Sequence, residues 1–589
     1  MLNEVKTQIS NVVKSALESA LAHGQLMLDE IPDIQLEPPK LEIHGDIACP
    51  LPLSLAKQAK MPPYQIAERI ATHIDVEQET LIDKIEIVKP GFINFFLSTT
   101  WLYDLLRRIH AHGGEFGKCP NSCEFGYNSK QRIQVEFVSA NPTGPLNVVN
   151  GRAASVGDTI VNLLNAVGYK AEREYYINDA GEQTYALARS IDARYRELLG
   201  EKDVSFPENG YPGEYVIELA QRLIDRDDAR YLDMSESERL EAFRRFGCTE
   251  IAAEQKKDLE RFGVFYDVWM NERAIRDTGK PAEIIKMFDE KGYLYESDKP
   301  TGEKSGFESM TGIATWFKST EFGDKEDRVL VKSNGNFTYI VPDIAYHYNK
   351  FTRGFDRVID LWGPDHHGQI GLMKAAIKAL GFGDDQLDIL IVQQVNIIEK
   401  GETKKMSKRK GQYYTLRQLI DELAKNVDER FAVDVARYFF LMRSTNAKLD
   451  FDINLAITQA DENPVFYVQY AHARICSIFR QMAERGITQQ PIDNLQLDMM
   501  TSDEEVRLMK KLADFPEIVL NSAQKIEPHH IPHYLQEVAS LFHAFYGKHR
   551  VLDAVEPELT QARLVLIDCV RTVLRNGLTL LGITAPETM

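Results

Sequence analysis

The sequence predicts an α/β protein of several domains, with a small α/β module first, a larger α/β domain next and an all-helical bundle last. Two observations favour the central domain: a strand, a Pro/Gly loop and a helix follow one another within residues 131–183, and short strands recur between 327 and 361. The bundle is predicted because apolar residues beyond 453 recur at helical spacing. A length of 589 residues suffices for about four domains with large cores.

Residues 1–119 are predicted to form the first module. Its predicted elements are an opening helix, helices at 55–59 and 64–73, and strands at 84–89 and 92–97. Pro90-Gly91 joins the two strands as a turn pair. From these residues alone, a packing domain and a ligand-contacting domain are equally compatible with the pattern.

Residues 131–183 open the central domain. Gln131–Val138 alternates between apolar and polar side chains, which predicts a strand, and a Pro/Gly loop at Asn141–Pro145 leads into a helix. A glycine-containing loop lets backbone approach phosphate, and a helix N-terminus offers free N–H groups with a partial positive charge. The stretch indicates a nucleotide-phosphate site, although many βα units share this order and the signal alone is weak.

The middle of the central domain is predicted to mix helices and strands. The charged stretch 184–264 is interpreted as a helical insertion with a solvated surface. Asn334-Gly335 predicts a hairpin between strands at 327–332 and 336–340. Asp343 is predicted to cap the helix that follows.

A further apolar strand at 357–361 runs into a polar segment that contains Gly363, Asp365, His366 and His367. Open α/β sheets bind ligands at the carboxyl ends of such strands. The alternative is that Asp365 caps a helix and that both histidines pack.

A basic, glycine-bounded stretch spans residues 400–411. Its basic residues are Lys400, Lys404, Lys405, Lys408, Arg409 and Lys410, against the single acid Glu402. Most charge runs are solvated surface. A cationic loop can, however, close over a triphosphate and neutralise charge that develops on a leaving pyrophosphate.

Residues from 453 onward are almost wholly helical in pattern, with predicted helices at 464–482, 502–518 and 562–581. An aromatic stripe of Phe466, Tyr467 and Tyr470 lies near the start. Such a stripe is more often core than a stacking platform, yet an exposed tyrosine beside Arg474 suits unpaired bases. Both interpretations stay open.

Composition indicates a soluble globular protein, with 44% apolar and 27% charged residues. No apolar run reaches the roughly 18 residues of a membrane span, and no signal-peptide core is found. Six scattered cysteines predict reduced thiols and a cytoplasmic protein. His110, His112, Cys119 and Cys123 fit no common zinc pattern, so no metal site is predicted. The net charge of −19 does not exclude nucleic acid, because phosphate contacts depend on local patches.

The motifs resemble those of class I aminoacyl-tRNA synthetases. Residue by residue, they are most similar to the motifs of the bacterial arginyl-tRNA synthetase family. The matching runs are Val135–Leu146, Glu174–Gly181 and Lys405–Lys408. The resemblance implies a Rossmann-like class I synthetase catalytic domain at 120–452, with the helical insertion near 184–264 and a KMSK loop at 400–411. It also implies an additional tRNA-contacting domain at 1–119 and an α-helical anticodon-binding domain at 453–589.

The implied reaction is ATP-dependent activation of L-arginine to arginyl-adenylate, followed by transfer to the 3′-terminal adenosine of tRNA(Arg). ATP would act with Mg²⁺. No covalent enzyme intermediate is needed, so positioning and charge stabilisation supply the rate. The implied partners are tRNA(Arg), L-arginine and ATP, and the family is commonly monomeric.

The resemblance also assigns roles to residues. The implied catalytic residues are Lys405, Ser407 and Lys408. The implied ATP contacts are Pro142, Gly144, Asn147, Asn150, Gly363, Asp365, His366, Met406 and Lys408. The implied arginine contacts are Glu136, Ser139, Asn141, Tyr339, Asp343 and His366. The implied tRNA contacts are Tyr467, Arg474 and Met589. A guanidinium is always charged and forked, so the carboxylates of Glu136 and Asp343 suit it.

One departure concerns the first signature, where the family usually carries His-x-Gly-His and this chain has Asn147-Val148-Val149-Asn150. Both asparagines can donate hydrogen bonds but cannot carry positive charge, and Val149 occupies space that glycine leaves free. Because the other motifs are kept, we expect an active enzyme with a variant signature. The alternative is a paralogue that binds tRNA without charging it. An adenylate-forming enzyme that uses no tRNA is disfavoured, because the helical bundle would then have no role.

Overall fold

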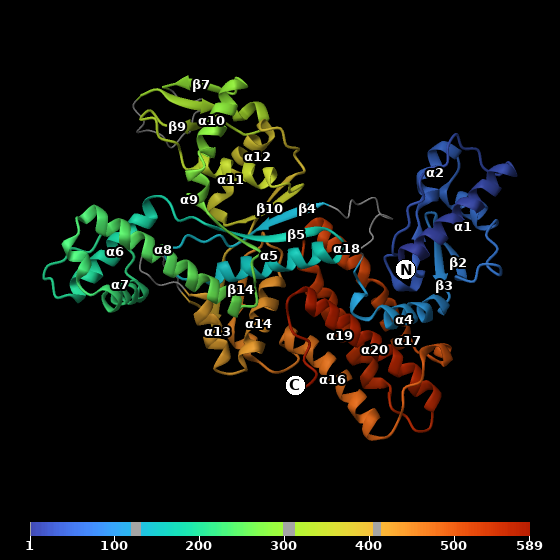
Figure 1. The fold of residues 1–589 in the computed structure, drawn as a ribbon. Helices are drawn as coiled ribbons and strands as arrows, with labels where there is room; N and C mark the ends of the chain where they lie inside the picture. The colour runs from blue at the N-terminus through green and yellow to red at the C-terminus, as the bar shows by residue number, and fades with distance from the viewer. Residues whose placement is uncertain (1, 119–130, 299–311, 405–413) are drawn as a thin grey trace.

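The computed structural model describes residues 2–118, 131–298, 312–404 and 414–589. Figure 1 shows a small N-terminal module in blue, a central sheet flanked by helices, and a helical C-terminal module in orange and red. A group of helices, α6 to α8, extends from the central sheet on the side away from the N-terminal module (Figure 1). Within the described ranges, no helix is both long and apolar enough to cross a membrane.

The N-terminal module packs helices against an antiparallel sheet of order β1-β3-β2. Its elements are α1 (Leu2–Ala22), β1 (Ile47–Cys49), α2 (Leu51–Ala59), α3 (Pro63–Ala71), β2 (Ile82–Val88), β3 (Phe92–Leu97) and α4 (Thr100–His112). Ile9, Val13 and Leu17 recur at helical spacing on α1 and are fully buried, as is Phe95 of β3. The two predicted strands correspond to β2 and β3. The sequence did not predict β1, because three residues are too few to show alternation.

The central sheet consists of five parallel strands in the order β11-β10-β4-β5-β6. They are β4 (Arg132–Glu136), β5 (Lys170–Ile177), β6 (Val268–Asn271), β10 (Arg357–Trp362) and β11 (Leu387–Ile391). The first strand in the chain lies at the centre, and successive strands add first on one side and then on the other. This is the doubly wound order of nucleotide-binding sheets, with its switch point between β4 and β10.

Alternate residues of these strands face different helices. Ile133 and Val135 belong to the core that includes α5 (Val148–Ala166). Val358 belongs to a second core that includes α11 (Ile340–Thr352) and α12 (Ile370–Ala379). The sheet is therefore covered by α5 on one face and by α11 and α12 on the other.

The segment that leads into α11 differs from the prediction. Only Arg328–Val331 forms a strand (β9), and Phe337 makes a single bridge to Val331. α11 begins at Ile340, so Asp343 lies inside the first turn and does not cap the helix. The reason is that Pro342 can occupy the first turn, where backbone N–H groups have no partner within the helix.

The helical insertion lies between β5 and β6 and has a core of its own. Its helices are α6 (Glu182–Leu198), α7 (Glu214–Asp227) and α8 (Glu236–Arg261). The remaining helices of the central region are α9 (Glu272–Asp277), α10 (Lys280–Glu290), α13 (Leu416–Ala424), α14 (Glu429–Leu441) and α15 (Ile453–Ile457). Two small sheets contain β7 (Leu294–Ser297), β8 (Ala314–Phe317) and β9, and β12 (Val395–Glu399), β13 (Glu402–Thr403) and β14 (Leu449–Asp452).

The C-terminal module consists of α16 (Pro464–Glu484), α17 (Asp503–Ala513), α18 (Phe515–Lys525), α19 (His530–Lys548) and α20 (Pro557–Leu580). The single helix predicted at 502–518 is wrong, because the structure divides it at Asp514. Pro516 explains the division, since a proline is tolerated in the first turn of a new helix and disrupts a helix interior.

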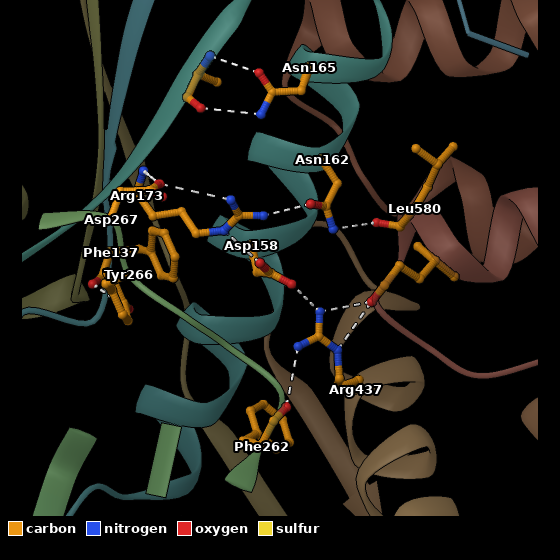
Figure 2. Close-up of polar contacts among 12 residues, drawn as sticks. Phe137, Asp158, Asn162, Asn165, Arg173, Phe262, Tyr266, Asp267, Arg437 and Leu580 are labelled. Atoms are coloured by element: carbon orange, nitrogen blue, oxygen red, sulfur yellow. Dashed lines mark hydrogen bonds and ion pairs between the residues drawn. The ribbon is translucent and has the colours of Figure 1, made fainter. Parts of the chain in front are cut away.

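A buried junction ties α5 to the C-terminal module (Figure 2). Arg437 of α14 has no exposed side-chain surface, and its Nη2 donates to the Asp158 carboxylate of α5 at 2.5 Å and to the Leu581 carbonyl at 2.9 Å. Its Nη1 donates to the Phe262 carbonyl at 3.4 Å. Arg173 of β5 donates to the second Asp158 oxygen at 2.8 Å. We call this group the Arg437 junction.

Candidate active site

The carboxyl ends of β4 and β10 lie side by side at the switch point. The loop that contains Ser139 and Asn141 leaves β4, and a short 3-10 turn, Pro364–Gln369, leaves β10. Sheet order thus brings the predicted residues after β4 to the same edge as those after β10, where open α/β sheets bind ligands.

The loop after β4 begins with a strained turn. Val138 has φ 69° and Ser139 has φ 37°, both in the left-handed region that β-branched residues avoid. The Ser139 N–H donates to the Phe137 carbonyl at 3.0 Å, so Val138 is the centre of a γ-turn. The backbone N–H of Tyr176 donates to Ser139 Oγ at 3.1 Å and holds the turn in place. Strain of this kind persists where the surroundings impose it, typically at ligand sites.

Helices of the insertion hold the same loop from outside. Gln255 of α8 donates to the carbonyls of Asn141 at 3.1 Å and Gly144 at 2.8 Å. The Tyr215 hydroxyl of α7 donates to the Thr143 carbonyl at 2.7 Å. The interpretation of the insertion as solvated surface was therefore incomplete, because its inner side positions the loop. Pro142 is buried in this arrangement, and Gly144 is partly exposed.

The first turn of α5 is closed by a capping box. Asn147 Oδ1 accepts the backbone N–H groups of Val149 at 2.9 Å and Asn150 at 3.0 Å, and Asn150 Oδ1 accepts the Asn147 N–H at 3.0 Å. Within the described residues, the Nδ2 groups of both asparagines have no partner. The amide oxygens hold the helix start, and the amide nitrogens stay available as donors. Val149 is half-buried against the hydrophobic core.

The residues that flank 405–413 meet beside this helix start. The Val148 N–H donates to the Tyr414 carbonyl at 3.2 Å, and the Leu416 N–H donates to the Leu146 carbonyl at 2.8 Å. Lys404 Nζ lies 4.8 Å from the centre of the Tyr414 ring. The predicted residues Lys405, Met406, Ser407 and Lys408 lie outside the described residues, whereas Tyr414, the first described residue after them, is bonded to the start of α5.

Carboxylates gather on the α11 side of the switch point. Asp343 is partly buried, and its pKa is raised to about 7 by burial, then by the neighbouring carboxylates of Glu272 and Glu136. Burial also raises the pKa of Glu272, although Arg276 donates to it at 2.6 Å. Glu136 is 7% exposed. The arrangement concentrates negative charge in one place.

Tyr176 of β5 lies among the same acids. Its buried hydroxyl has no hydrogen-bond partner in the described part of the chain. Burial raises its pKa, followed by the charges of Glu272, Asp343 and Glu136. We call Glu136, Asp343, Glu272 and Tyr176 the acid slot. A buried group of acids beside an unpartnered hydroxyl favours a cationic ligand with several N–H donors.

Exposed polar residues form the rim near the slot. Tyr339 is 67% exposed, and its hydroxyl accepts from Gln369 Nε2 at 3.1 Å. His366 Nδ1 lies 3.4 Å from Gln369 Oε1. Asp365 does not cap a helix, because the 3-10 turn has Gly363 at its N-cap without a side-chain bond. His366 and His367 are exposed, so the packing alternative is wrong for both.

The predicted tRNA contacts lie on α16 and at residue 589. Tyr467 packs against His543 of α19 with ring centres 4.6 Å apart, and the Arg474 guanidinium lies over the Tyr546 ring at 5.4 Å. Met589 is 50% exposed. The end of α16 and the segment after α19 border an open hollow of about 600 Å³, whose lining includes the basic residues Arg485, Lys548, His549 and Arg550.

The predicted absence of a metal site concerns residues only partly covered by the structure. The described residues contain no cluster of three or more His, Cys, Asp or Glu side chains arranged to hold a metal ion. Cys119 and Cys123 lie outside them. Cys49, Cys248, Cys476 and Cys569 are buried free thiols.

Three family models match the chain in succession. The "Arginyl tRNA synthetase N terminal domain" matches residues 4–97, the catalytic domain of "tRNA synthetases class I (R)" matches 121–434, and the "DALR anticodon binding domain" matches 468–589. The chain belongs to the arginyl-tRNA synthetase family.

Relatives in this arginyl-tRNA synthetase family align over their whole length. The arginine–tRNA ligase of Caldanaerobacter subterraneus subsp. tengcongensis is 44% identical, with 100% of both chains covered. The ligase of Carboxydothermus hydrogenoformans is 42% identical, again over 100% of both chains. The structure of Thermus thermophilus arginyl-tRNA synthetase matches with a TM-score of 0.73 at 22% identity, over 99% of this chain and 100% of that one, which shows a shared fold. The family and the three-module fold class expected from the sequence are confirmed.

Several site residues of this synthetase were missed by the sequence analysis. Glu272 and Gln369 are single polar residues in ordinary helical contexts, and only sheet order brings them to the slot and its rim. Gln255 and Tyr215 belong to amphipathic helices whose polar residues usually face solvent. The EYYINDAG run contained Tyr176, but nothing in its spacing distinguished this tyrosine from Tyr175, which is fully buried.

Proposed function

We propose that this protein is an arginine–tRNA ligase that activates L-arginine with ATP and transfers it to the 3′-terminal adenosine of tRNA(Arg). The observation that carries the proposal is the acid slot, which lies at the carboxyl ends of β4, β5 and β6 beside the first turn of α11. A permanent, forked cation is the ligand that such acids bind best. The full-length relatives that bear the name arginine–tRNA ligase support the same activity.

Arginine would place its guanidinium in the slot and its carboxylate toward the loop after β4. Glu136 and Asp343 would accept from the guanidinium, and Tyr339 and His366 would contact the ligand at the rim. Ser139 and Asn141 would bind the amino-acid end. This assignment is supported by the fixed loop, in which Asn141 Nδ2 donates to Gln183 Oε1 at 2.7 Å. Lysine and ornithine would be rejected, because a single ammonium leaves buried acceptors unpaired.

ATP would bind between the start of α5 and the end of β10. Pro142, Gly144 and the side-chain Nδ2 groups of Asn147 and Asn150 would face it from one side, and Gly363, Asp365 and His366 from the other. We assign the phosphates to the stretch that contains Lys405, Met406, Ser407 and Lys408, with Mg²⁺ neutralising further charge. A carboxylate oxygen of arginine would attack the α-phosphorus, and the bond to the β-phosphate would break as pyrophosphate leaves. The ribose 2′-hydroxyl of tRNA would then attack the arginyl carbonyl, and AMP would leave.

The run Asn147-Val148-Val149-Asn150 would act as a variant of the first signature. The unpartnered Nδ2 groups of Asn147 and Asn150 support this role, because they can donate to phosphate while their oxygens keep the capping box. Without a positive charge they would stabilise phosphate less than histidines do, by about tenfold in rate each. The basic stretch would carry the remaining stabilisation.

The outer modules would bind tRNA(Arg). We assign tRNA contact to residues 1–119, catalysis to 120–452 and anticodon binding to 453–589, with Tyr467, Arg474 and Met589 as contacts. The basic hollow near Arg485 and Arg550 supports an anionic partner for the C-terminal module. We further propose a monomer that acts in the cytoplasm, where its buried cysteines would stay reduced.

The second candidate is a paralogue that binds tRNA without charging it, and the variant signature is the observation that favours it. Arginylation of a tRNA(Arg) transcript by the purified protein separates the two, and tRNA must also be present when ATP–pyrophosphate exchange is measured. We expect charging that depends on arginine and ATP. Retained tRNA(Arg) binding without exchange or charging would select the paralogue.

A further inference from the structure

Three buried carboxylates occupy equivalent positions on neighbouring strands. Asp360 of β10 is paired in register with Glu136 of β4, and Glu136 is paired with Glu174 of β5. They are 0%, 7% and 1% exposed. Residues in register point to the same face of a sheet, and like charges side by side are unfavourable. We call them the strand carboxylates, and their charge needs compensation from the element that covers them.

One face of α11 supplies that compensation. His347 Nε2 lies 2.5 Å from Asp360 Oδ2, and Arg353 Nη2 lies 2.9 Å from Glu174 Oε1. The Tyr346 hydroxyl donates to Glu174 Oε1 at 2.5 Å. Tyr346 and His347 lie on α11, and Arg353 follows at its C-cap. The contacts fix α11 against the sheet and so set where Asp343 stands relative to Glu136.

Lys350 is the central cation of this layer. Its Nζ donates to Glu136 Oε2 at 2.5 Å and to Asp360 Oδ1 at 2.8 Å, and its side chain has no exposed surface. Burial opposes its charge, but Asp360, Glu136 and Glu174 together raise its pKa above the usual value. Lys350 is therefore a permanent internal ammonium, shared between two strands.

Glu136 belongs both to the strand carboxylates and to the acid slot. Lys350 occupies its Oε2, and its Oε1 has no hydrogen-bond partner within the described residues. One oxygen thus faces the internal cation, and the other is available to a ligand in the slot. A guanidinium N–H that reaches Oε1 meets a carboxylate that is already oriented.

We propose that Lys350 is a positioning residue for arginine: it holds one carboxylate oxygen of Glu136 and so turns the other toward the substrate guanidinium. This inference rests on the proposed function, because it takes arginine as the occupant of the slot. Lys350 touches no ligand in this scheme and acts only through Glu136.

The proposal has a pH signature. The groups that face Glu136 are Glu174 and Tyr176 from β5, Asp360 from β10, Asp343, Tyr346 and Lys350 from α11, and Glu272 and Arg276 from α9. Acids outnumber cations in this set. Removal of Lys350 would therefore leave this set with surplus negative charge, so that a proton taken up by the set near neutral pH would be released again in alkaline solution.

The test compares Lys350→Met with Arg353→Met in the full-length protein. Arg353 is the matched control, because it neutralises Glu174 in the same layer and has no contact with Glu136. Calorimetric titration with L-arginine is run at several pH values, and each variant is expressed as a ratio to wild type. We expect Lys350→Met to weaken binding about tenfold at pH 7 and to approach wild type near pH 9, with Arg353→Met within about threefold throughout.

Equal weakening by both variants at every pH would overturn the proposal, because it would indicate loosening of α11 alone. If Lys350→Met does not fold, Lys350→Met/Asp360→Asn removes one cation and one anion together, with Asp360→Asn as its control. The double variant should still bind arginine weakly at every pH, because Glu136 has lost the contact that orients it, and wild-type affinity in it would contradict the inference. Wild type that binds arginine but does not charge tRNA would refute the proposed function and leave the role of Lys350 intact. Wild type that does not bind arginine would refute both.

Discussion

The layer between α11 and the sheet and the Arg437 junction beside α5 are both buried, yet their charges are balanced differently. In the junction, the single acid Asp158 receives donors from Arg437 and Arg173, and other donors of Arg437 end on backbone carbonyls (Figure 2). In the layer, the strand carboxylates share Lys350, Arg353 and His347, and the acid slot adds Asp343 and Glu272. The Arg437 junction is a closed set, because its acid is balanced by cations within the junction. The layer and the acid slot form an open set, because acids outnumber cations there.

The packing around the two sets of charges also differs. A Cβ at Gly582 would lie 2.2 Å from Arg437 Nη2, so the junction has no room for another group. The slot instead contains a buried tyrosine hydroxyl with no partner in the described residues. Buried polar groups are normally satisfied, and exceptions gather where a ligand completes them. Both clusters are buried, so burial does not tell them apart. The difference is that the polar groups of a structural cluster already have partners, whereas those of a binding cluster still lack some.

The largest effect is expected from breaking the closed set. Arg437→Met would remove one of the two cations at buried Asp158 and leave the Leu581 and Phe262 carbonyls without their donor, a loss of about 3–5 kcal/mol of unfolding free energy. Urea unfolding measures the loss. Arg430→Met on the same helix is the control, because Arg430 is 55% exposed and should change stability by less than about 1 kcal/mol. Similar losses in both variants would contradict a closed junction.

The second prediction concerns Asp343 in the acid slot, which belongs to the open set. Asp343→Asn removes an acid that has no cationic partner among the described residues, so stability should be unchanged or slightly raised. Arginine binding should weaken about a hundredfold, because a charge-assisted contact to a buried group is lost. The KM for arginine in the exchange assay measures this. Asp365→Asn, at an exposed position on the rim, is the matched control and should raise that KM much less.

The open set should also respond to pH. Because the pKa of Asp343 is raised to about 7 and a guanidinium favours the ionised acid, arginine affinity should rise about tenfold from pH 6 to pH 8 and then level off. For unliganded protein the sign is opposite. The folded state holds this proton more tightly than the unfolded state, so Asp343 costs stability as pH rises toward 8. Titration calorimetry and urea unfolding across this range measure both effects, and Asp343→Asn should abolish them.

A smaller effect is expected from loosening the loop after β4. Gln255→Leu would remove the donors to the Asn141 and Gly144 carbonyls and the acceptor for the Tyr175 hydroxyl at 2.9 Å. The KM for ATP should rise about threefold to tenfold, because the loop would sample other conformations. Gln221→Leu on α7, whose amide contacts only Asp225 in the described residues, should leave it unchanged. Equal KM values for ATP in the two variants would contradict a role of the insertion in positioning the loop after β4.

The sequence could predict what local pattern determines. Alternation gave the strand at 131–138, which the structure shortens to Arg132–Glu136 because Val138 and Ser139 turn into the left-handed region. Helical spacing and proline positions gave most helix locations. The roles of Glu136, Asn141 and Asp343 came from the family resemblance and stay predictions, but their places next to recognisable strand ends and helix starts could be read from the sequence.

What the sequence could not predict depends on strand order and register. Asp360, Glu136 and Glu174 are far apart in the chain, and nothing local indicates that three acids share one row. The polar face of α11 looks like a solvated surface until the sheet beneath it is known. Asp158 likewise depends on Arg437, 279 residues away. Such contacts belong to the fold as a whole.

The Arg437 junction has a consequence for biosynthesis. Asn162 of α5 donates to the Leu580 carbonyl at 3.1 Å across a separation of 418 residues. At ribosomal speeds of about 5–20 residues per second, this partner emerges roughly 20–80 seconds after α5. Nascent chains therefore carry α5 for most of their translation without its final support, and chaperones that protect it have that interval in which to act.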